Sequence, residues 1–468
     1  MIALRPYQTQ IVEGCRGAFR NGQSSALVQL ATGGGKTVLG SFMVQGSASR
    51  GLTCWWLVHR RELLSQASKT FYSMGIEHSF VAGGRPTDPG ARVQVGSVQT
   101  VARRLDVLPP PDLIVFDEAH HTGAAQWRQI YDAFPNARKI GLTATPWRLD
   151  GVGLGRWFET MVQGPTTAEL IEAGSLSNYR LFAPSSVDTS AIGTVGGDFK
   201  RDELATLMDK PTITGDAVQH YLRLARGKRA VAFAVSIEHS RHIAAQFNAA
   251  GVRAEHVDGS TAADERDAAV QRFIRGETLI LSNAELFGEG FDVPAIEAAI
   301  LLRPTKSLSL HLQQVGRALR PSPGKAEAIV LDHAGNSLLH GLPDDDREWS
   351  LEDRQKRRKG QAGEISVRQC SKCFRVFRPA PQCPGCGFAV VGPVREVEQV
   401  EGQLQEVDPS VLRAARKQEE RRAQSLDDLI RLGEQRGYKN PRVWAEKFHA
   451  ARQVARARYQ PSYGRAYA

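Results

Sequence analysis

Residues 26–37 read Ala-Leu-Val-Gln-Leu-Ala-Thr-Gly-Gly-Gly-Lys-Thr, a short apolar run that leads into three glycines, a lysine and a threonine. The apolar run is typical of a buried strand, and glycines 33 to 35 let backbone N–H groups close on phosphate oxygens. We expect a helix to begin at Lys36, so that its positive end also faces the phosphates. Lys36 would reach the β- and γ-phosphates, and the Thr37 hydroxyl would bind Mg²⁺. The strict pattern has glycine where this chain has Leu30.

A second motif, Asp-Glu-Ala-His at residues 117–120, follows the apolar run Leu-Ile-Val-Phe at 113–116. The carboxyl ends of parallel strands form the edge at which such sheets bind ligands. Asp117 would hold Mg²⁺ there, and Glu118 would orient and deprotonate the attacking water. A lone Asp-Glu pair is usually a solvated strand end, but its place downstream of a phosphate loop favours ATP hydrolysis.

Short apolar runs alternate with helix-like segments in two blocks, which predicts an α/β fold with parallel sheets flanked by helices. The expected strands are 26–30, 52–58, 93–95, 113–116 and 139–142 in the first block, and 230–235, 278–281, 298–302 and 328–331 in the second. The predicted organisation is a first domain at 1–165, a linker at 166–210, a second domain at 211–340, a charged linker at 341–366, a small cysteine-rich module at 367–390 and a basic helical tail at 391–468.

The second block ends in Gln-Gln-Val-Gly-Arg-Ala-Leu-Arg at residues 313–320. Arg317 and Arg320 are three residues apart on a helix-like segment and would share a face. Two guanidiniums on one face can reach a γ-phosphate from the opposite domain as arginine fingers, and Gln313 lies on the same segment. The alternative is a basic, solvated helix face.

Three further stretches complete the expected site. In Arg-Pro-Tyr-Gln at 5–8, the amide of Gln8 can read both edges of adenine, and Arg5 or Tyr7 can stack on the ring; alternatively these residues only start a helix. Gly290 and Asp292, in the glycine-rich turn 288–294, would touch the ribose or the polynucleotide backbone across the cleft. The hydroxyl of Thr143 would link the acidic motif to the polynucleotide groove, or is an ordinary residue at the end of a strand.

Four of the six cysteines form two Cys-x-x-Cys pairs, which favours a metal over disulfides in a reducing compartment. Thiolates at this spacing can close a tetrahedral Zn²⁺ site, whereas a redox site would need one reactive pair. The four expected ligands are Cys370, Cys373, Cys383 and Cys386. Basic and aromatic residues interleave with them, which is typical of either a nucleic-acid contact or the small core of a ribbon.

The net charge of +10 favours polyanionic partners. No stretch approaches the ~18 consecutive apolar residues of a membrane span, and the N-terminus lacks the pattern of a signal peptide. We therefore expect a cytoplasmic protein with no membrane partner. From Arg436 onward, eight Lys and Arg residues stand against one acidic residue, so the tail is expected to add affinity for polynucleotide.

Taken in order, these motifs resemble those of superfamily 2 helicases of the DEAH-box type over residues 4–336. The stretches Arg-Pro-Thr-Lys-Ser at 303–307 and Asp-His-Ala-Gly-Asn at 332–336, with the cysteine-rich C-terminus, are similar to RadD-type DNA repair helicases and their phage relatives. The resemblance implies two RecA-like domains, with ATP between them and DNA across their top. The C-terminal tail departs from that family.

The resemblance also implies roles for individual residues. The expected catalytic set is Lys36, Asp117, Glu118, Gln313, Arg317 and Arg320. The residues expected to bind ATP or Mg²⁺ are Arg5, Gln8, Thr32, Gly33, Gly34, Gly35, Lys36, Thr37, Asp117, Gly290 and Asp292. The residues expected near the polynucleotide or the coupling path are Arg60, Gln99, Thr100 and Thr143.

The leading hypothesis is an ATP-dependent DNA helicase or translocase that acts on single-stranded, duplex or forked DNA in repair, recombination or phage replication. We expect a monomer that meets repair or replication proteins. The alternatives are an RNA helicase and the motor subunit of a restriction-type complex, which would need a nuclease partner. A non-hydrolysing binding module is a further alternative, against which the intact Lys36, Glu118 and Arg317 argue.

Overall fold

The computed structural model describes most of the chain. The described residues are 3–122, 124–148, 151–183, 192–195, 198–208, 211–284, 296–353, 367–389, 418–420, 422–423, 425–436 and 440–458. The chain divides into two compact units, residues 1–392 and residues 393–468.

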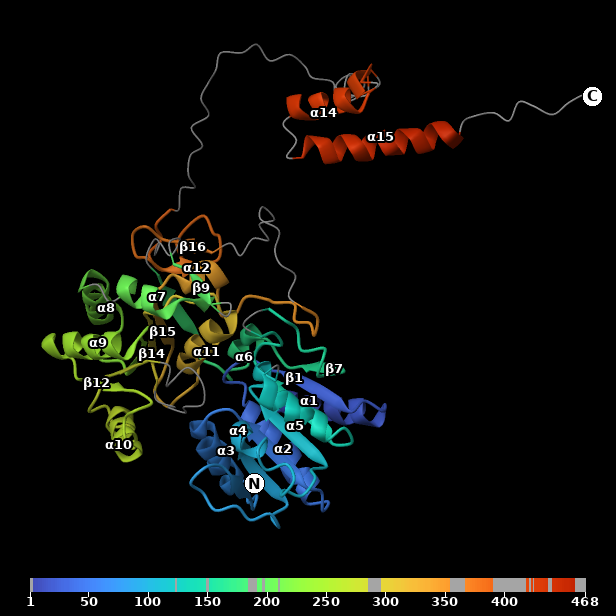
Figure 1. Ribbon diagram of the computed structural model, residues 1–468. Coiled ribbons are helices and arrows are strands. Elements are labelled where there is room, and N and C mark those ends of the chain that lie inside the picture. Colours follow the sequence, from blue (N-terminus) through green and yellow to red (C-terminus); the bar gives the residue numbers. More distant parts are fainter. Residues whose placement is uncertain are drawn as a thin grey trace, which may run out of the picture. The chain divides into compact units, whose positions relative to one another are not determined.

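The first lobe is a seven-stranded parallel sheet in the order β3-β4-β2-β5-β6-β1-β7, with helices on both faces (Figure 1). Its strands are β1 (Ser25–Gln29), β2 (Cys54–Val58), β3 (Ser79–Val81), β4 (Val93–Ser97), β5 (Leu113–Asp117), β6 (Arg138–Thr143) and β7 (Thr160–Gln163). Its helices are α1 (Pro6–Arg20), α2 (Lys36–Ala48), α3 (Arg61–Ser73), α4 (Val98–Val101), η1 (Ala119–His121) and α5 (Ala125–Ala133).

The continuous apolar runs of this lobe are explained by burial on both faces of the sheet. Successive residues of β2 point to opposite faces, so Trp55 and Trp56 enter two different hydrophobic clusters, and both are fully buried. Helices α2 and α3 pack on the face of Trp56. The five strands expected in this lobe are confirmed within two residues at each end.

The second lobe is a six-stranded parallel sheet in the order β12-β13-β11-β14-β15-β8. Its strands are β8 (Tyr179–Phe182), β11 (Ala230–Phe233), β12 (Ala254–Val257), β13 (Ile280–Asn283), β14 (Ala298–Leu301) and β15 (Ala328–Asp332). Its helices are α8 (Pro211–Leu224), α9 (Ile237–Ala249), α10 (Ala263–Ile274), α11 (Leu308–Ala318) and α12 (Asn336–His340). The segment between the lobes also contains α6 (Thr167–Glu172), β9 (Thr194–Val195), β10 (Asp198–Phe199) and α7 (Arg201–Met208).

Two segments that the sequence analysis treated as linkers are built into the lobes. Strand β8 lies inside the expected linker 166–210, yet it pairs with β15 and buries Leu181 and Phe182 at the edge of the second sheet. Residues 342–353 lie inside the expected charged linker 341–366. At the start of this segment, Leu342 is buried in the core of the second lobe. Near its end, Leu351 packs against a hydrophobic cluster of the first lobe. Residues 354–366 lie outside the described part of the chain.

The cysteine-rich module packs on the edge of the second lobe. It contains β16 (Arg368–Gln369) and β17 (Val376–Phe377), which pair antiparallel. Arg375 forms a β-bridge with Phe182, and the N–H of Ala183 donates to the carbonyl of Phe374 at 3.3 Å. Val376 is buried among the residues of the second lobe's core. The module therefore extends the lobe at the edge formed by β8.

The second unit contains α14 (Leu426–Gln435) and α15 (Pro441–Arg458), which lie side by side (Figure 1). Leu429 and Ala445 are fully buried between them. Arg436 pairs with two glutamates of the same unit, and the guanidinium of Arg452 donates to the carbonyls of Ala423 and Glu420. Several cations of the tail therefore stabilise this unit internally. Among the helices described in the whole chain, none is both long and apolar enough to cross a membrane.

Candidate active site

The sheet register of the first lobe brings three motifs to one edge. Strands β1 and β6 pair with Gln29 opposite Thr143, and β5 and β6 pair with Asp117 opposite Leu142. The phosphate loop, the acidic motif and the segment that begins at Thr143 therefore all leave the sheet at neighbouring carboxyl ends. This is the edge at which parallel sheets bind ligands.

The phosphate loop has the conformation that its glycines predict. Gly33 and Gly35 adopt positive φ angles of 87° and 82°, which side chains rarely tolerate. Helix α2 begins at Lys36, as expected, with Gly35 as its N-cap residue. The amine of Lys36 donates to the carbonyl of Leu30 at 3.3 Å, so the lysine folds back over the loop. Burial lowers the pKa of Lys36, although the charges of Glu118 and Asp117 act in the opposite direction.

The stretch at residues 5–8 contacts the phosphate loop directly. The amide nitrogen of Gln8 donates to the carbonyls of Gly34 and Gly35, both at 3.4 Å, and its oxygen accepts from the N–H of Arg5 at 3.0 Å. The hydroxyl of Tyr7 donates to the carbonyl of Gly34 at 2.9 Å. In this structure the side chain of Gln8 is hydrogen-bonded to the carbonyls of the phosphate loop. The expected recognition of adenine by Gln8 stays a prediction.

The acidic motif lies in a strained turn at the end of β5. Glu118 adopts a left-handed conformation with φ 52° and ψ 54°, which is unusual for a residue with a side chain and is often found at functional sites. Its N–H donates to the carboxylate of Asp117 at 3.1 Å. Burial, reinforced by the charge of Glu118, raises the pKa of Asp117 to about 7, and the charge of Lys36 opposes this shift. A divalent cation would stabilise the ionised form of such a carboxylate.

A chain of buried polar groups leads from the acidic motif to β6. The ring of His120 lies 3.4 Å from a carboxylate oxygen of Glu118 and contacts the hydroxyl of Thr143 at 3.3 Å. That hydroxyl donates to the carbonyl of Thr145 at 2.7 Å. Thr143 is fully buried. Its expected role, near the polynucleotide or on the coupling path, stays a prediction.

The second lobe presents helix α11 to the same cavity. Gln313 and Arg317 are buried on α11, whereas Arg320 lies just beyond its end, because the helix stops at Ala318. The two arginines still line one cavity of about 340 Å³ together with residues of the phosphate loop and the acidic motif. The full lining is Arg5, Thr32, Gly33, Gly35, Lys36, Thr37, Val38, Leu63, Gln66, Thr70, Asp117, Glu118, Ser175, Gln313, Arg317, Arg320 and Pro321.

A close contact brings α11 against the phosphate loop, and a lysine holds the end of α11 within the second lobe. A Cβ atom on Gly316 would lie 2.6 Å from the side chain of Thr32, so only glycine allows this approach. The amine of Lys325 donates to the carbonyls of Ala318 and of Arg320, the latter at 2.7 Å. Lys325 thereby supplies donors to the carbonyls at the end of α11, next to the arginines.

Several buried polar atoms in the cavity lack a hydrogen-bond partner within the described structure. They include the hydroxyl of Thr32 and the amide nitrogen of Gln313. Unsatisfied buried polar atoms are rare in proteins and cost free energy, which is why they often mark ligand sites. Both residues line the cavity, where the phosphates of a nucleotide could supply the missing partners.

Comparison with known proteins gives the family. Family models match the chain over residues 1–148, as the res subunit of type III restriction enzymes, and over residues 214–322, as the helicase conserved C-terminal domain. A 51.5 kDa protein of a Lactococcus phage is 36% identical over 323 residues, which are 69% of this chain and 68% of the phage protein. The chain belongs to the superfamily 2 helicases. Its two lobes are those of a nucleic-acid-dependent ATPase.

Two further comparisons bear on this superfamily 2 member. The Saccharomyces cerevisiae protein IRC3, described as an ATP-dependent helicase, is 32% identical over 380 residues, which are 74% of this chain and 55% of the yeast protein. The chain thus spans only about half of that relative. A fragment described as an HsdR subunit of a type I restriction enzyme from Vibrio vulnificus shares 23% identity at a TM-score of 0.60, covering 74% of this chain and 67% of the fragment. This likeness shows the fold of two tandem RecA-like domains.

Arg60, Gln99 and Thr100 lie just beyond the carboxyl ends of the paired strands β2 and β4. The amide of Gln99 donates to the carbonyl of His59 at 3.2 Å and is exposed, and Thr100 accepts from Ser97 at 2.8 Å. Arg60 caps the start of α3 and is partly exposed. Their contacts with a polynucleotide stay predictions. The expected contacts of Gly290 and Asp292 fall on residues outside the described part of the chain.

Sequence reasoning missed several residues of the cavity. Leu63, Gln66 and Thr70 line it from α3, Ser175 lines it from the connection between the lobes, and Pro321 lines it from the second lobe. The three positions on α3 are spaced by three and four residues, as expected for one helix face. This spacing was visible in the sequence, but nothing in it indicated that the face turns toward the phosphate loop.

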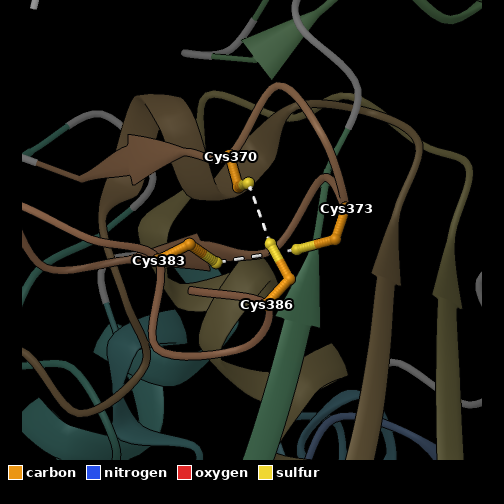
Figure 2. Close-up of side chains that lie close together, drawn as sticks. All are labelled: Cys370, Cys373, Cys383 and Cys386. Atoms are coloured by element: carbon orange, nitrogen blue, oxygen red, sulfur yellow. Dashed lines mark hydrogen bonds between the residues drawn. The ribbon is translucent and has the colours of Figure 1, made fainter. Parts of the chain in front are cut away.

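The four cysteines converge, as Figure 2 shows. The sulfurs of Cys370 and Cys386 lie 3.6 Å apart, as do those of Cys373 and Cys383, and all four lie within 4.8 Å of one another. A tetrahedral site with Zn–S bonds of about 2.3 Å places sulfurs about 3.8 Å apart. The N–H of Gly385 points at the sulfur of Cys383 at 3.4 Å, which suits a thiolate. The cluster fits a zinc ribbon.

Proposed function

We propose that this helicase-family protein is an ATP-dependent DNA helicase or translocase. One observation carries the proposal: arginines 317 and 320 of the second lobe line the same cavity as Lys36, Asp117 and Glu118 of the first. A site assembled from two lobes is completed only when both approach each other. Binding of a polynucleotide to both lobes can therefore control hydrolysis.

The residues expected to act in catalysis have separate tasks in this mechanism. The backbone N–H groups of the phosphate loop and the amine of Lys36 hold the β- and γ-phosphates. Glu118 orients the attacking water and accepts its proton. Arg317 and Arg320 stabilise the negative charge that develops on the transferred phosphoryl group. Mg²⁺, when bound at Thr37 and Asp117, would neutralise phosphate charge.

The coupling path would transmit the state of the nucleotide to the polynucleotide. His120 contacts both Glu118 and Thr143, so a change at the carboxylate alters the partners of the threonine hydroxyl. The segment that follows Thr143 leaves the sheet edge between the lobes, and Gln99 and Arg60 are exposed or partly exposed at neighbouring strand ends. These positions support the proposal that the polynucleotide lies along this edge.

DNA is the proposed substrate because the resemblance to RadD-type proteins and the restriction-enzyme relatives both concern DNA-acting systems. A role in repair, recombination or phage replication is proposed on the same ground, with repair or replication proteins as partners and a monomer as the working form. The second candidate is the motor of a restriction-type complex, supported by 25% identity over 370 residues to a type I restriction enzyme subunit of Escherichia coli.

Zinc is proposed as a structural ion of the ribbon. Four thiolates at tetrahedral spacing, with a backbone N–H directed at one sulfur, match a closed structural site. The ribbon packs on β8, far along the chain from the residues that bind ATP. We therefore propose that zinc stabilises the edge of the second lobe and takes no part in hydrolysis.

The experiment is a steady-state ATPase assay with single-stranded, duplex and forked DNA and with RNA of matched length. The proposal expects stimulation by at least one DNA form, abolition by Lys36→Ala, and weak stimulation by RNA. Stronger stimulation by RNA than by every DNA would overturn the choice of substrate. Stimulation confined to a mixture with a nuclease partner would favour the restriction-type motor.

A further inference from the structure

Residues 342–353 cross from the second lobe to the first and touch both. At their start, Leu342 is buried in the core of the second lobe. The guanidinium of Arg347 donates to the carbonyls of Leu342 at 2.7 Å and of Asp345 at 2.9 Å, which closes a compact turn. Asp344 accepts from the hydroxyl of Tyr179 in β8. This end is fixed to the second lobe by side chains and by backbone.

The other end is fixed to the first lobe mainly through backbone groups. The N–H of Gly155 donates to the carbonyl of Leu351 at 2.8 Å, and the N–H of Gly153 donates to the carboxylate of Asp353 at 2.9 Å. The indole N–H of Trp147 donates to the carbonyl of Glu352 at 3.0 Å. A Cβ atom on Gly153 would lie 2.2 Å from the carbonyl oxygen of Leu351, so this seat requires glycine.

Between its ends, the segment passes beside the active site. The ring of Trp349 packs against that of Trp147 with centroids 5.0 Å apart, and Trp147 follows the segment that begins at Thr143. A small cavity of about 40 Å³ is lined by Trp349 together with groups from both lobes. These groups include Thr32 of the phosphate loop, Ala144, and Gly316 and Leu319 at α11.

We propose that residues 342–353 are an inter-lobe strap that holds α11 against the phosphate loop before any polynucleotide is bound. Trp349 is then a positioning residue for Arg317 and Arg320. The role rests on the ATPase assignment. The strap adds a second tether, held on the first lobe by hydrogen bonds, to the covalent connection at residues 164–178. A second tether with its own anchors raises the effective concentration of one lobe at the other.

The strap predicts that the protein hydrolyses ATP at a measurable basal rate when no polynucleotide is present. Without its anchor, the lobes would approach each other less often in the absence of DNA. Loss of the Trp349 ring contact and of the hydrogen bonds near it corresponds to about a tenfold loss in the population of approached lobes. At saturating DNA, the polynucleotide replaces the strap and most of the rate returns.

The experiment compares Trp349→Ala and Gly153→Ala with two controls, in the full-length protein. Gly17→Ala matches the glycine substitution but places its Cβ in open space on α1, and Leu339→Ala removes an exposed apolar side chain on α12, just before the strap. Trp349→Phe keeps an aromatic ring and should retain most of the basal rate. Because Gly153→Ala acts from the first lobe, it carries the test alone if Trp349→Ala fails to fold.

The measurement is kcat and KM for ATP, each without DNA and with saturating single-stranded DNA. The strap is supported if both variants lose about tenfold or more in basal kcat, keep KM for ATP within twofold, and return to within about twofold of the wild type with DNA. Unchanged basal kcat in the folded variants, an equal loss with and without DNA, or an effect on KM alone would overturn it. So would a wild-type protein with no measurable basal hydrolysis. A wild-type protein that DNA does not stimulate would instead overturn the proposed function.

Discussion

Replacing Gly316 by alanine would push α11 away from the phosphate loop. The new Cβ would lie 2.6 Å from the Cβ and Cγ2 atoms of Thr32. Carbon atoms in contact lie about 3.5 to 4.0 Å apart, so the two elements must separate by about 1 Å. A change of rotamer cannot relieve the contact, because the Cβ atom of Thr32 is fixed to its own backbone. The displacement therefore moves the arginines relative to the phosphates.

The expected cost is about 10²-fold in kcat, since a displacement of about 1 Å can change a rate by that factor. The affinity for ATP should change little, because Lys36 and the loop amides all belong to the first lobe. The substitution does not weaken the helix itself, since alanine is favoured over glycine in a helix interior by about 1 kcal/mol. A loss of ATP turnover with an unchanged unfolding midpoint would thus show that the geometry of the site has changed and the stability of the fold has not.

The assay is ATP turnover at saturating polynucleotide, together with ATP binding followed by a fluorescent analogue. Gly17→Ala is the matched control, because it makes the same change in α1 with nothing within 4 Å of the new Cβ. A folded Gly316→Ala protein with kcat within twofold of the wild type would refute the argument that the lobes must approach this closely.

Three other outcomes are expected. Arg317→Ala should lower kcat by about 10³-fold or more with little change in ATP affinity, because an arginine finger acts on transition-state charge; steady-state kinetics with a binding assay separate the two, and an effect on KM alone would count against it. Cys383→Ser should lose one zinc per chain by elemental analysis and lower the unfolding midpoint, while ATP turnover at 25 °C stays within a few-fold; metal-free wild-type protein purified without chelator would contradict this. Burial lowers the pKa of Lys325 to about 8. The unfolded lysine keeps its proton to about pH 10.4, so between these pH values the unfolded state binds more protons, and the free energy of unfolding should rise with pH by at most about 3 kcal/mol. Denaturant titrations should show this rise in the wild type and not in Lys325→Met, and parallel curves would refute it.

The central strands of both lobes could be predicted from the sequence, because strands buried on both faces read as continuous apolar runs. Strand β12 could not, because its polar residues are satisfied by distant partners. Glu255 pairs with Arg272 of α10, and His256 contacts Ser240 of α9. Such pairs are visible only once the fold brings them together.

The contacts of the expected linker 341–366 with both lobes, made by residues 342–353, could not be predicted for a related reason. The composition of this segment is charged, and its anchors on the first lobe are mostly backbone carbonyls that meet Gly153, Gly155 and Trp147. Backbone contacts leave almost no trace in the residue pattern. In the tail, a count of cations overstated the charge open to a polynucleotide, since Arg436 and Arg452 are engaged within the second unit.

The motifs of the site were predicted because their chemistry fixes both residue type and spacing. The partners of Gln8 were not, because a glutamine that reads adenine and one that supports a loop look the same in sequence. The contact of Gly316 with Thr32 was also missed, since it joins two lobes far apart in the chain. The distance between two elements that lie far apart in the chain could not be predicted from the sequence.

The most direct test of the account uses Glu118→Gln and the wild type with single-stranded DNA. The wild type should hydrolyse ATP at least about tenfold faster when DNA is present, because DNA binding brings both lobes onto one nucleotide. Glu118→Gln should bind ATP with near wild-type affinity and yet show no turnover, since it lacks the base and keeps the phosphate cradle. Turnover like that of the wild type in Glu118→Gln, or a wild-type rate that DNA leaves unchanged, would contradict a DNA-driven ATPase assembled from two lobes.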